Sequence, residues 1–248
     1  MDKSPIGVLF SKVKNESCVD FNFENGMYTF LNCFSYLYYR KHVDLYKNYH
    51  TIYCDGILMQ KLVSLAGIKT QRISFDMTSL APIVFEHAEK NNMSVALIGS
   101  DQISNDIAAK RILEKYSKLI VIEKRNGYFN NPAEEGIYLD LLRNIDPDII
   151  IVGMGTPGQD LFLSQMYLRE WTGVAFTCGG FLHQTAKNGS KYYPDFFNKY
   201  NLRWLYRIID EPKLLYRYLF DYPKSILLFL YDLMCFKIMA KSHNKDEL

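Results

Sequence analysis

The sequence predicts an α/β fold in which a Rossmann-like, mostly parallel and doubly wound sheet is followed by a C-terminal helical appendage. Short runs of apolar, strand-forming residues alternate along the chain with longer segments whose apolar residues recur at helical spacing. Glycine and polar residues gather directly after these runs. This alternation is typical of helices packed on a parallel sheet. A change to aromatic and basic composition after about residue 190 predicts the appendage.

Six runs are expected to be strands: 27–31, 51–54, 94–99, 119–123, 148–153 and 174–178. The segment 103–118 carries the helical spacing expected between two strands. No further strand and helix unit fits after the last run. We therefore expect a single α/β domain over 1–190 and a helical segment over 191–248, with helix starts or breaks at Pro194, Pro212 and Pro223.

The composition excludes several classes of protein. The 248 residues include 29 Lys and Arg against 27 Asp and Glu, and this net charge of +2 is too balanced for a nucleic-acid-binding surface. The five cysteines are scattered and show no CxxC spacing, which argues against a disulfide framework and against a zinc site. The sequence shows no secretory signal pattern and no window apolar enough to span a bilayer, so we expect a cytoplasmic protein.

Residues directly after the predicted strands are the candidates for a binding site, because ligands of doubly wound sheets bind beyond the carboxyl ends of the strands. These positions are Asn32, Asp55 with Gly56, Gly99 to Asp101, Asn126 to Tyr128, Gly153 to Gln159, and Gly179 with Gly180.

Asp55, in this set, has two competing interpretations, and Asp76 lies further along the chain. Asp55 could act as a general base if its pKa lies near the working pH and it reaches a substrate hydroxyl. The local sequence alone favours an Asp-Gly turn or a helix N-cap at Asp55. Asp76 is expected to be the N-cap of a helix that begins near Thr78.

The turn at Gly99 opens a predicted helix for which Ser104 is a candidate N-cap. Free backbone N–H groups at such a helix start could bind a diphosphate. Most turns between a strand and a helix share this geometry, however, and the segment lacks both the GxGxxG pattern and the P-loop lysine.

The sequence predicts no metal and no other cofactor. Its histidines form no HxH or HExxH pattern. The DxD sequence from Asp146 to Asp148 could chelate a divalent ion, but it enters the strand 148–153 at its amino end. We therefore interpret it as a turn.

The appendage combines Arg203, Arg207 and Arg217 with many aromatic residues. These aromatic residues are Tyr192, Tyr193, Trp204, Tyr206, Tyr216 and Tyr218. The arginines could clamp a pyrophosphate or meet lipid headgroups, and a solvated basic face explains the composition equally well. Arg207 and Arg217 would share one helix face if the helix continued past Pro212.

Residues 225–240 carry an apolar stripe at helical spacing that Asp232 and Lys237 interrupt. The stripe consists of Ile226, Leu227, Leu230, Leu233 and Met234, and the basic residues around it are Lys224, Lys237 and Lys241. This pattern favours a helix that lies in a membrane interface over one that crosses the membrane, and a terminal helix packed on the core is the alternative.

Over about residues 25–220 the ordered motifs resemble the WecG/TagA/CpsF family of bacterial glycosyltransferases. The matching positions are Asn32, Asp55 with Gly56, Arg72 to Asp76, Gly99 with Ser100, Gly127 to Phe129, Gly153 to Asp160, Leu202 to Arg207, Glu211 with Pro212, and Arg217 with Tyr218. Each motif is weak alone, whereas their order and spacing are specific.

The resemblance implies an inverting, metal-independent transfer of a sugar, of the N-acetylmannosamine type or another hexose. The donor would be a UDP-sugar and the acceptor a polyprenyl-diphosphate-linked saccharide, in cell-surface polysaccharide or teichoic-acid-type synthesis on the inner face of the cytoplasmic membrane. It also implies that Asp55 is the catalytic base. The implied substrate-binding residues are Asn32, Arg72, Asp76, Gly99, Gly127, Tyr128, Gly153, Gly155, Pro157, Gln159, Gly180, Gln184, Arg207 and Arg217.

Several residues depart from the family pattern. The segment 72–76 is one residue short and lacks a glycine, Ser100 replaces a glycine, and Asp160 and Arg203 each replace a glutamate. His183 to Thr185 stand near a missing aspartate, which leaves the donor sugar open.

A non-catalytic nucleotide-sugar-binding subunit of a polysaccharide assembly complex is the alternative function. A Rossmann-type oxidoreductase would need a dinucleotide fingerprint that the chain lacks. Formation of a homo-oligomer also stays open.

Overall fold

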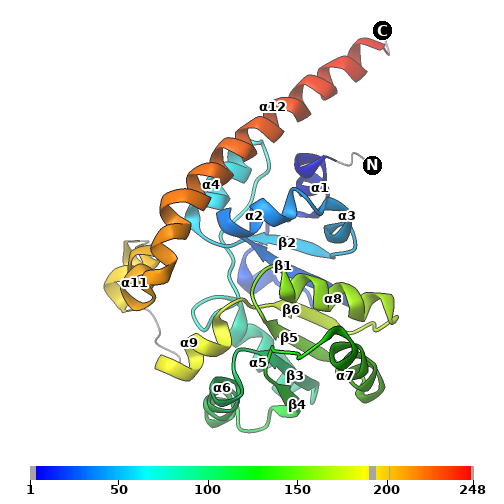
Figure 1. The fold of residues 1–248 in the computed structure, drawn as a ribbon, viewed down its shortest axis with the longest axis vertical. Coiled ribbons are helices and arrows are strands. Elements are labelled where there is room, and N and C mark those ends of the chain that lie inside the picture. The colour runs from blue at the N-terminus through cyan, green and yellow to red at the C-terminus, as the bar shows by residue number, and fades with distance from the viewer. Residues whose placement is uncertain (1–3, 190–193, 201, 247–248) are drawn as a thin grey trace.

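The computed structural model describes residues 4–189, 194–200 and 202–246. Its centre is a six-stranded sheet with the order β2-β1-β6-β5-β3-β4, in which all neighbouring strands run parallel (Figure 1). The strands are β1 (Gly26–Leu31), β2 (Thr51–Cys54), β3 (Ser94–Gly99), β4 (Ile120–Arg125), β5 (Ile149–Gly153) and β6 (Val174–Thr177). Each of the six predicted strands is confirmed.

The central strands are buried on both faces, which explains their continuous apolar sequence. Leu97 of β3 pairs with Ile151 of β5, and Ile98 pairs with Val152. All four side chains are fully buried. A parallel sheet buried in this way needs helices on both of its faces.

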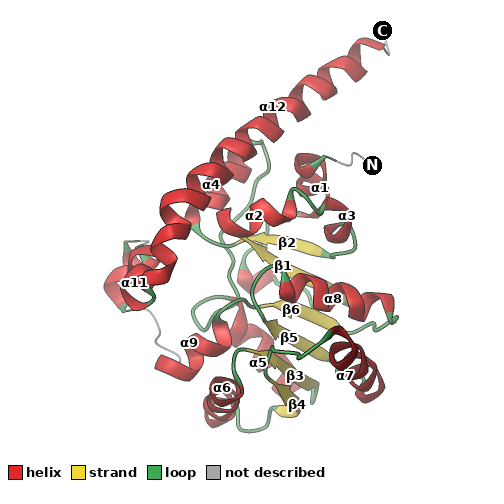
Figure 2. Ribbon diagram, viewed as in Figure 1, coloured by secondary structure: helices red, strands yellow, loops and turns green. Residues whose placement is uncertain are grey.

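Helices cover both faces of the sheet, which confirms the doubly wound arrangement (Figure 2). One layer contains α1 (Pro5–Lys12), α2 (Cys33–Tyr39), α3 (Val43–Tyr46), α4 (Ile57–Leu65), α7 (Pro132–Ile145) and α8 (Gly158–Leu168). The opposite layer contains the 3-10 turn η1 (Cys18–Asp20), α5 (Leu80–Lys90), α6 (Gln102–Lys115) and α9 (Phe181–Asn188).

Two predicted helix starts are wrong. Helix α6 is capped by Asp101, whose carboxylate accepts hydrogen bonds from the Ser104 backbone N–H (2.9 Å) and hydroxyl (2.6 Å). Ser104 therefore lies inside the helix. Helix α5 begins at Leu80, so Asp76 belongs to the preceding turn, where it accepts a hydrogen bond from the Thr78 N–H at 2.7 Å.

The turn interpretation of the DxD sequence is confirmed. Asp146 ends α7 in the left-handed conformation, with φ of 50°. Asp148 accepts hydrogen bonds from the backbone N–H (2.7 Å) and the hydroxyl (2.6 Å) of Ser94. This aspartate therefore joins the amino ends of β3 and β5, away from the edge of the sheet where a ligand is expected.

The C-terminal segment is helical but divided. Its elements are α10 (Asp195–Lys199), α11 (Arg203–Asp210), the 3-10 turn η2 (Pro212–Leu214), the π-helical turn η3 (Arg217–Asp221) and α12 (Tyr222–Asp246). Because α11 ends at Asp210, the helix does not continue past Pro212, and Arg207 and Arg217 belong to separate elements and do not share one helix face. Tyr192 and Tyr193 lie outside the described residues.

Helix α12 packs against α1 and α2 with one face, and its far end projects beyond the body of the protein (Figure 1). Ser225, Phe229, Asp232 and Leu233 are buried on that face. On the other face of α12 the stripe residues Leu227, Leu230 and Met234 are exposed. The core-packed alternative therefore holds for one face of the helix. The side chain of Lys241 lies outside the described part of the structure.

Candidate active site

A cavity of about 440 Å³ lies at the carboxyl edge of the sheet, beside the ends of β1, β2 and β6. This is the size of a small-ligand site. The C-terminal segment supplies the opposite wall through Trp204, Arg207, Leu214 and Tyr218. The strand ends and the C-terminal segment therefore enclose one site.

The cavity brings together Asp55 and most of the predicted substrate-binding residues. Those that line it are Asn32, Arg72, Asp76, Gly155, Gln159, Gly180, Gln184, Arg207 and Arg217. Residues more than 180 positions apart in the chain thus meet in one site. The common edge of a parallel sheet explains how the strand ends converge.

The remaining predicted residues do not line the cavity: Gly99, Gly127, Tyr128, Gly153 and Pro157. Close packing accounts for the glycines. A Cβ atom on Gly99 would lie 2.3 Å from the Gly153 carbonyl oxygen, and one on Gly153 would lie 2.9 Å from the Cys178 sulfur. The start of α6 already has an anion, the Asp101 carboxylate, at the position where a diphosphate was predicted.

Asp55 is partly buried and directly follows β2. Its backbone N–H donates to the Leu31 carbonyl oxygen at 2.9 Å, which fixes the residue beside the end of β1. Burial raises the pKa of its carboxyl group, and the nearby Asp76 raises it further. Arg72, a hydrogen bond from the Asn32 side chain and Arg207 oppose this rise in pKa. Asp55 therefore combines access to the cavity with raised basicity, as a general base requires.

Asn32 is both a helix cap and a neighbour of Asp55. Its side-chain oxygen accepts hydrogen bonds from the backbone N–H groups of Phe34 and Ser35, each at 3.0 Å, at the start of α2. The cap fixes the rotation of the side-chain amide. Its nitrogen is then directed to the carboxylate of Asp55.

The segment 72–76 runs alongside the end of β2. The N–H of Ile73 donates to the Cys54 carbonyl oxygen at 3.0 Å, and Cys54 and Arg72 form an isolated parallel bridge. This pairing places Arg72 and Asp76 on the same cavity wall as Asp55.

The turn between β5 and α8 positions Gln159. Gly155 adopts a φ of 72°, a left-handed conformation that favours glycine, and the space around its Cα is open. The side-chain oxygen of Gln159 accepts a hydrogen bond from the N–H of Gly179 at 2.9 Å. Gln159 thereby joins the turns that follow β5 and β6, while its side chain lines the cavity.

Asp160, directly after Gln159, is buried below the cavity and does not line it. Burial raises the pKa of its carboxyl group to about 6. The hydroxyl of Thr29 lies 3.4 Å from its Oδ1 atom. Asp160 therefore contacts residues of the core beneath the cavity and not the cavity itself.

Four aromatic residues also line the cavity: Phe34, Phe75, Tyr218 and Tyr222. Phe34 and Tyr222 were not among the candidates from the sequence. The ring of Phe34 supports the guanidinium of Arg217, whose Cζ lies 3.7 Å from the ring centroid. Burial lowers the pKa of Arg217, and the charge of Arg207 lowers it further. The position of Phe34 in the first turn after β1 was the signal available in the sequence.

The charged lining of the cavity is predominantly basic. Arg72, Arg203, Arg207 and Arg217 contribute four positive charges against the two carboxylates of Asp55 and Asp76. Such a cavity is suited to an anionic ligand with phosphate oxygens. Among residues 4–189, 194–200 and 202–246, no three His, Cys, Asp or Glu side chains group as metal ligands.

The fold and the site define a protein of the α/β class with an anion-binding cavity at the carboxyl edge of its sheet. The model of the glycosyl transferase WecG/TagA/CpsF family matches residues 6–237. The chain belongs to this family and is a glycosyltransferase.

Two relatives illustrate the range of this similarity. The chain is 36% identical over 219 residues to the UDP-Gal:alpha-D-GlcNAc-diphosphoundecaprenol beta-1,4-galactosyltransferase of Shigella boydii, covering 88% of this chain and 91% of that protein. It is 27% identical over 146 residues to the N-acetylglucosaminyldiphosphoundecaprenol N-acetyl-beta-D-mannosaminyltransferase of Staphylococcus aureus (strain MRSA252), covering 59% of this chain and 54% of that protein.

Proposed function

We propose that this glycosyltransferase moves a hexose from a UDP-sugar to a polyprenyl-diphosphate-linked saccharide, with galactose as the first donor sugar to test. The observation that carries the proposal is the placement of Asp55 in a cavity lined by four arginines. One carboxylate suits deprotonation of an acceptor hydroxyl, and the arginines suit two diphosphate-bearing substrates. The similarity to the Shigella galactosyltransferase, over nearly the full length of both chains, supports galactose over N-acetylmannosamine.

In the proposed reaction, the acceptor hydroxyl oxygen attacks the anomeric carbon from the side opposite to UDP. Asp55 accepts the hydroxyl proton while the new C–O bond forms. The bond between the anomeric carbon and the diphosphate oxygen breaks, and UDP leaves with that electron pair. Attack from the opposite side inverts the anomeric configuration.

Arginines would stabilise the diphosphate in this mechanism, in place of a divalent metal. Arg207 and Arg217 approach the cavity from two elements of the C-terminal segment, and Arg72 approaches from beside β2. Fixed positive groups directed at a developing negative charge lower the activation free energy without reorganisation. Asn32 and Gln159 would orient the sugar and phosphate oxygens.

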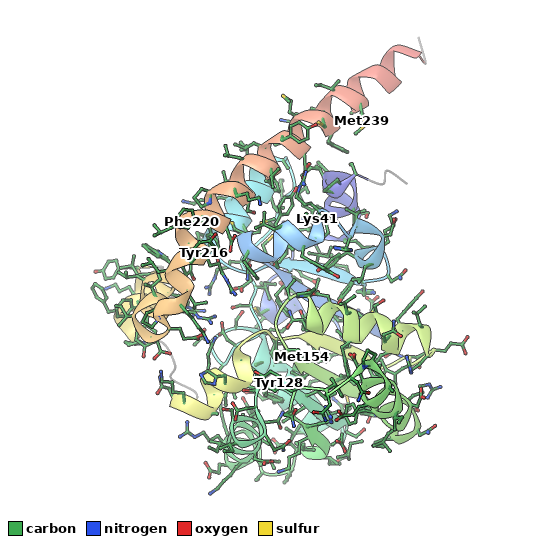
Figure 3. All side chains as sticks on the ribbon, viewed as in Figure 1. Lys41, Tyr128, Met154, Tyr216, Phe220 and Met239 are labelled. Atoms are coloured by element: carbon green, nitrogen blue, oxygen red, sulfur yellow. The ribbon has the colours of Figure 1, made fainter. Side chains whose placement is uncertain are left out.

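An exposed apolar surface on the C-terminal segment supports peripheral binding to the inner face of the cytoplasmic membrane. It consists of Tyr216, Leu219, Phe220, Leu227, Leu230, Tyr231, Met234 and Ile238. Lys213, Lys224 and Lys237 are exposed near it. Figure 3 shows Tyr216, Phe220 and Met239 along these helices. Apolar side chains beside lysines are typical of helices at anionic interfaces.

No helix among the described residues contains a stretch long and apolar enough to cross a bilayer. The membrane contact is tested with Leu227→Ser combined with Leu230→Ser, which leaves the buried face of α12 intact. We expect loss of sedimentation with anionic vesicles but unchanged UDP binding. Ile137→Ser, at an exposed position on α7, is the matched control. Unchanged sedimentation of the double variant would contradict the proposed contact.

The activity is tested by incubating the protein with a panel of UDP-hexoses and a short-chain polyprenyl-diphosphate GlcNAc. Mass spectrometry identifies the product, and the NMR coupling of its anomeric proton gives the configuration. We expect transfer from UDP-galactose with inversion. UDP-sugar binding without transfer from any donor would instead favour the non-catalytic nucleotide-sugar-binding subunit.

A further inference from the structure

The ion pair between Arg203 and Asp76 joins the C-terminal segment to the cavity wall that carries Asp55. Arg203, at the start of α11, donates through one terminal nitrogen to Asp76 Oδ2 at 3.0 Å. Its other terminal nitrogen lies 2.5 Å from the Thr78 hydroxyl oxygen. These contacts connect residues more than 120 positions apart in the chain.

This ion pair is more strongly shielded from water than the ion pair of Lys187 with Asp210, which also connects α11 to the body of the protein. The side chains of Arg203 and Asp76 are only 16% and 15% exposed. In the second contact, Lys187 of α9 pairs with Asp210 and is 44% exposed. Water and salt screen the buried pair less, so its charges act more strongly on their neighbours.

Asp76 also acts on Asp55. Both carboxylates line the cavity, and the pairing of Ile73 with Cys54 holds the segment that carries Asp76 beside the segment that carries Asp55. The negative charge of Asp76 disfavours the ionised form of Asp55. A cation bound to Asp76 reduces this repulsion.

We propose that Arg203 is a positioning residue for the catalytic base: by pairing with Asp76, it holds the start of α11 against the cavity wall and limits the repulsion between Asp76 and Asp55. This inference rests on the proposed role of Asp55 as the base. Arg203 acts through Asp76 and need not touch the substrate.

Other titratable groups face Asp55 from every neighbouring element and stay constant in the test. These are Cys33 at the start of α2, Cys54 of β2, Arg72, Arg207 of α11, Tyr218 of η3 and Tyr222 of α12. A substitution at Arg203 leaves all of them in place, so a change in the titration of Asp55 reports on Arg203 and Asp76.

The experiment measures kcat/KM against pH for the wild-type protein and for Arg203→Gln, Arg203→Lys, Asp76→Asn and the Arg203→Gln/Asp76→Asn double variant. The base must be ionised, so kcat/KM rises with pH through the pKa of Asp55. Arg203→Gln removes the cation that pairs with Asp76, and we expect the acidic limb of this variant to move up by about one pH unit. At pH values below the acidic limb, kcat/KM of Arg203→Gln is then roughly tenfold lower than that of the wild-type protein. Arg203→Lys returns the limb toward the wild-type position.

The Asp76→Asn background separates the indirect effect of Arg203 from a direct one. If Arg203 acts through Asp76, Arg203→Gln no longer moves the acidic limb in this background. A shift of the same size there would show that Arg203 acts on Asp55 directly, which overturns the proposal. If Asp76→Asn is too slow for a pH profile, Arg203→Gln and Arg203→Lys decide. The proposal is overturned if the acidic limb stays in place in Arg203→Gln, or if Arg203→Lys does not return it toward the wild-type position.

Lys187→Gln is the matched control, because it removes the exposed cation that contacts α11. We expect no movement of its acidic limb. UDP binding by calorimetry confirms that each variant is folded. Near-normal turnover of Asp55→Asn would remove the proposed function itself. An inactive Asp55→Asn together with an unshifted Arg203→Gln removes only the role of Arg203.

Discussion

Asp232 of α12 accepts two hydrogen bonds from Arg40, the C-cap residue of α2, from Nε to Oδ2 at 2.9 Å and from a terminal nitrogen to Oδ1 at 2.8 Å. The hydroxyl of Tyr36 donates to Oδ2 at 2.8 Å. The aspartate that interrupts the apolar stripe of the sequence is therefore the buried attachment of α12 to the body of the protein. This geometry satisfies most of the hydrogen-bonding capacity of the carboxylate, as a buried charge requires.

We expect Asp232→Asn to lower the free energy of unfolding by about 2–4 kcal/mol, because it leaves Arg40 without its charged partner. Urea unfolding measures the change. Asp146→Asn, which weakens an exposed ion pair with Arg143, should change stability by less than about 0.5 kcal/mol. Equal effects of the two substitutions would contradict the structural role of Asp232. Truncation after Tyr222 should likewise destabilise the protein.

Asp55→Asn should lower turnover by about 10²-fold or more, the scale expected for loss of a general base. UDP binding should persist, because the substitution keeps the shape of the side chain. Single-turnover kinetics and calorimetry measure the two quantities. Asp106→Asn, at an exposed position on α6, is the control and should retain normal turnover.

Asp160 should make stability depend on pH. Its folded-state pKa of about 6 lies above the ordinary value of 3.8, so the folded protein binds more protons than the unfolded chain between these values. The contribution of Asp160 is therefore most favourable below about pH 4 and is lost as the pH rises to about 6, by roughly 3 kcal/mol in total.

Asp160→Asn should consequently be more stable than the wild-type protein at pH 8, while the difference shrinks at pH 4. Urea unfolding of both proteins at the two pH values gives this difference directly. Equal stability differences at pH 4 and pH 8 would show that folding does not raise the pKa of Asp160.

The stacking of Arg217 on Phe34 should matter for transfer more than for folding. A cation–π contact contributes about 0.5–2 kcal/mol, so Phe34→Leu should lower kcat/KM by roughly 2- to 30-fold. Phe34→Tyr keeps the aromatic face and should retain most of the activity. Arg217→Ala should cut transfer far more than UDP binding. Equal activity of the leucine and tyrosine variants would argue against the stacking.

Transfer should continue in excess EDTA without added divalent ions, since arginines are proposed to neutralise the diphosphate. The measurement is product formation with and without the chelator. Loss of turnover in EDTA, reversed by magnesium or manganese, would contradict the arginine mechanism.

Much of the site could be predicted because it follows the sheet. Asn32 and Asp55 lie directly after buried strands, Gln159 lies in the first turn of the helix that follows β5, and parallel strands end at one edge. The role of Gly99 and Gly153 could not be predicted from the sequence. A glycine after a strand indicates that something approaches the backbone closely, but the sequence does not distinguish a ligand from a neighbouring strand.

The sequence by itself determined the six strands, the parallel sheet and its ligand-binding edge. The reason is that the apolar and polar pattern of a strand depends only on residues that are close together in the sequence. Only the tertiary structure decided how the C-terminal segment returns to that edge. The pairs Arg203 with Asp76 and Arg40 with Asp232 join residues 127 and 192 positions apart. Their formation depends on the path of the whole chain, and local periodicity carries no information about that path. The same path gave α12 one buried and one exposed face.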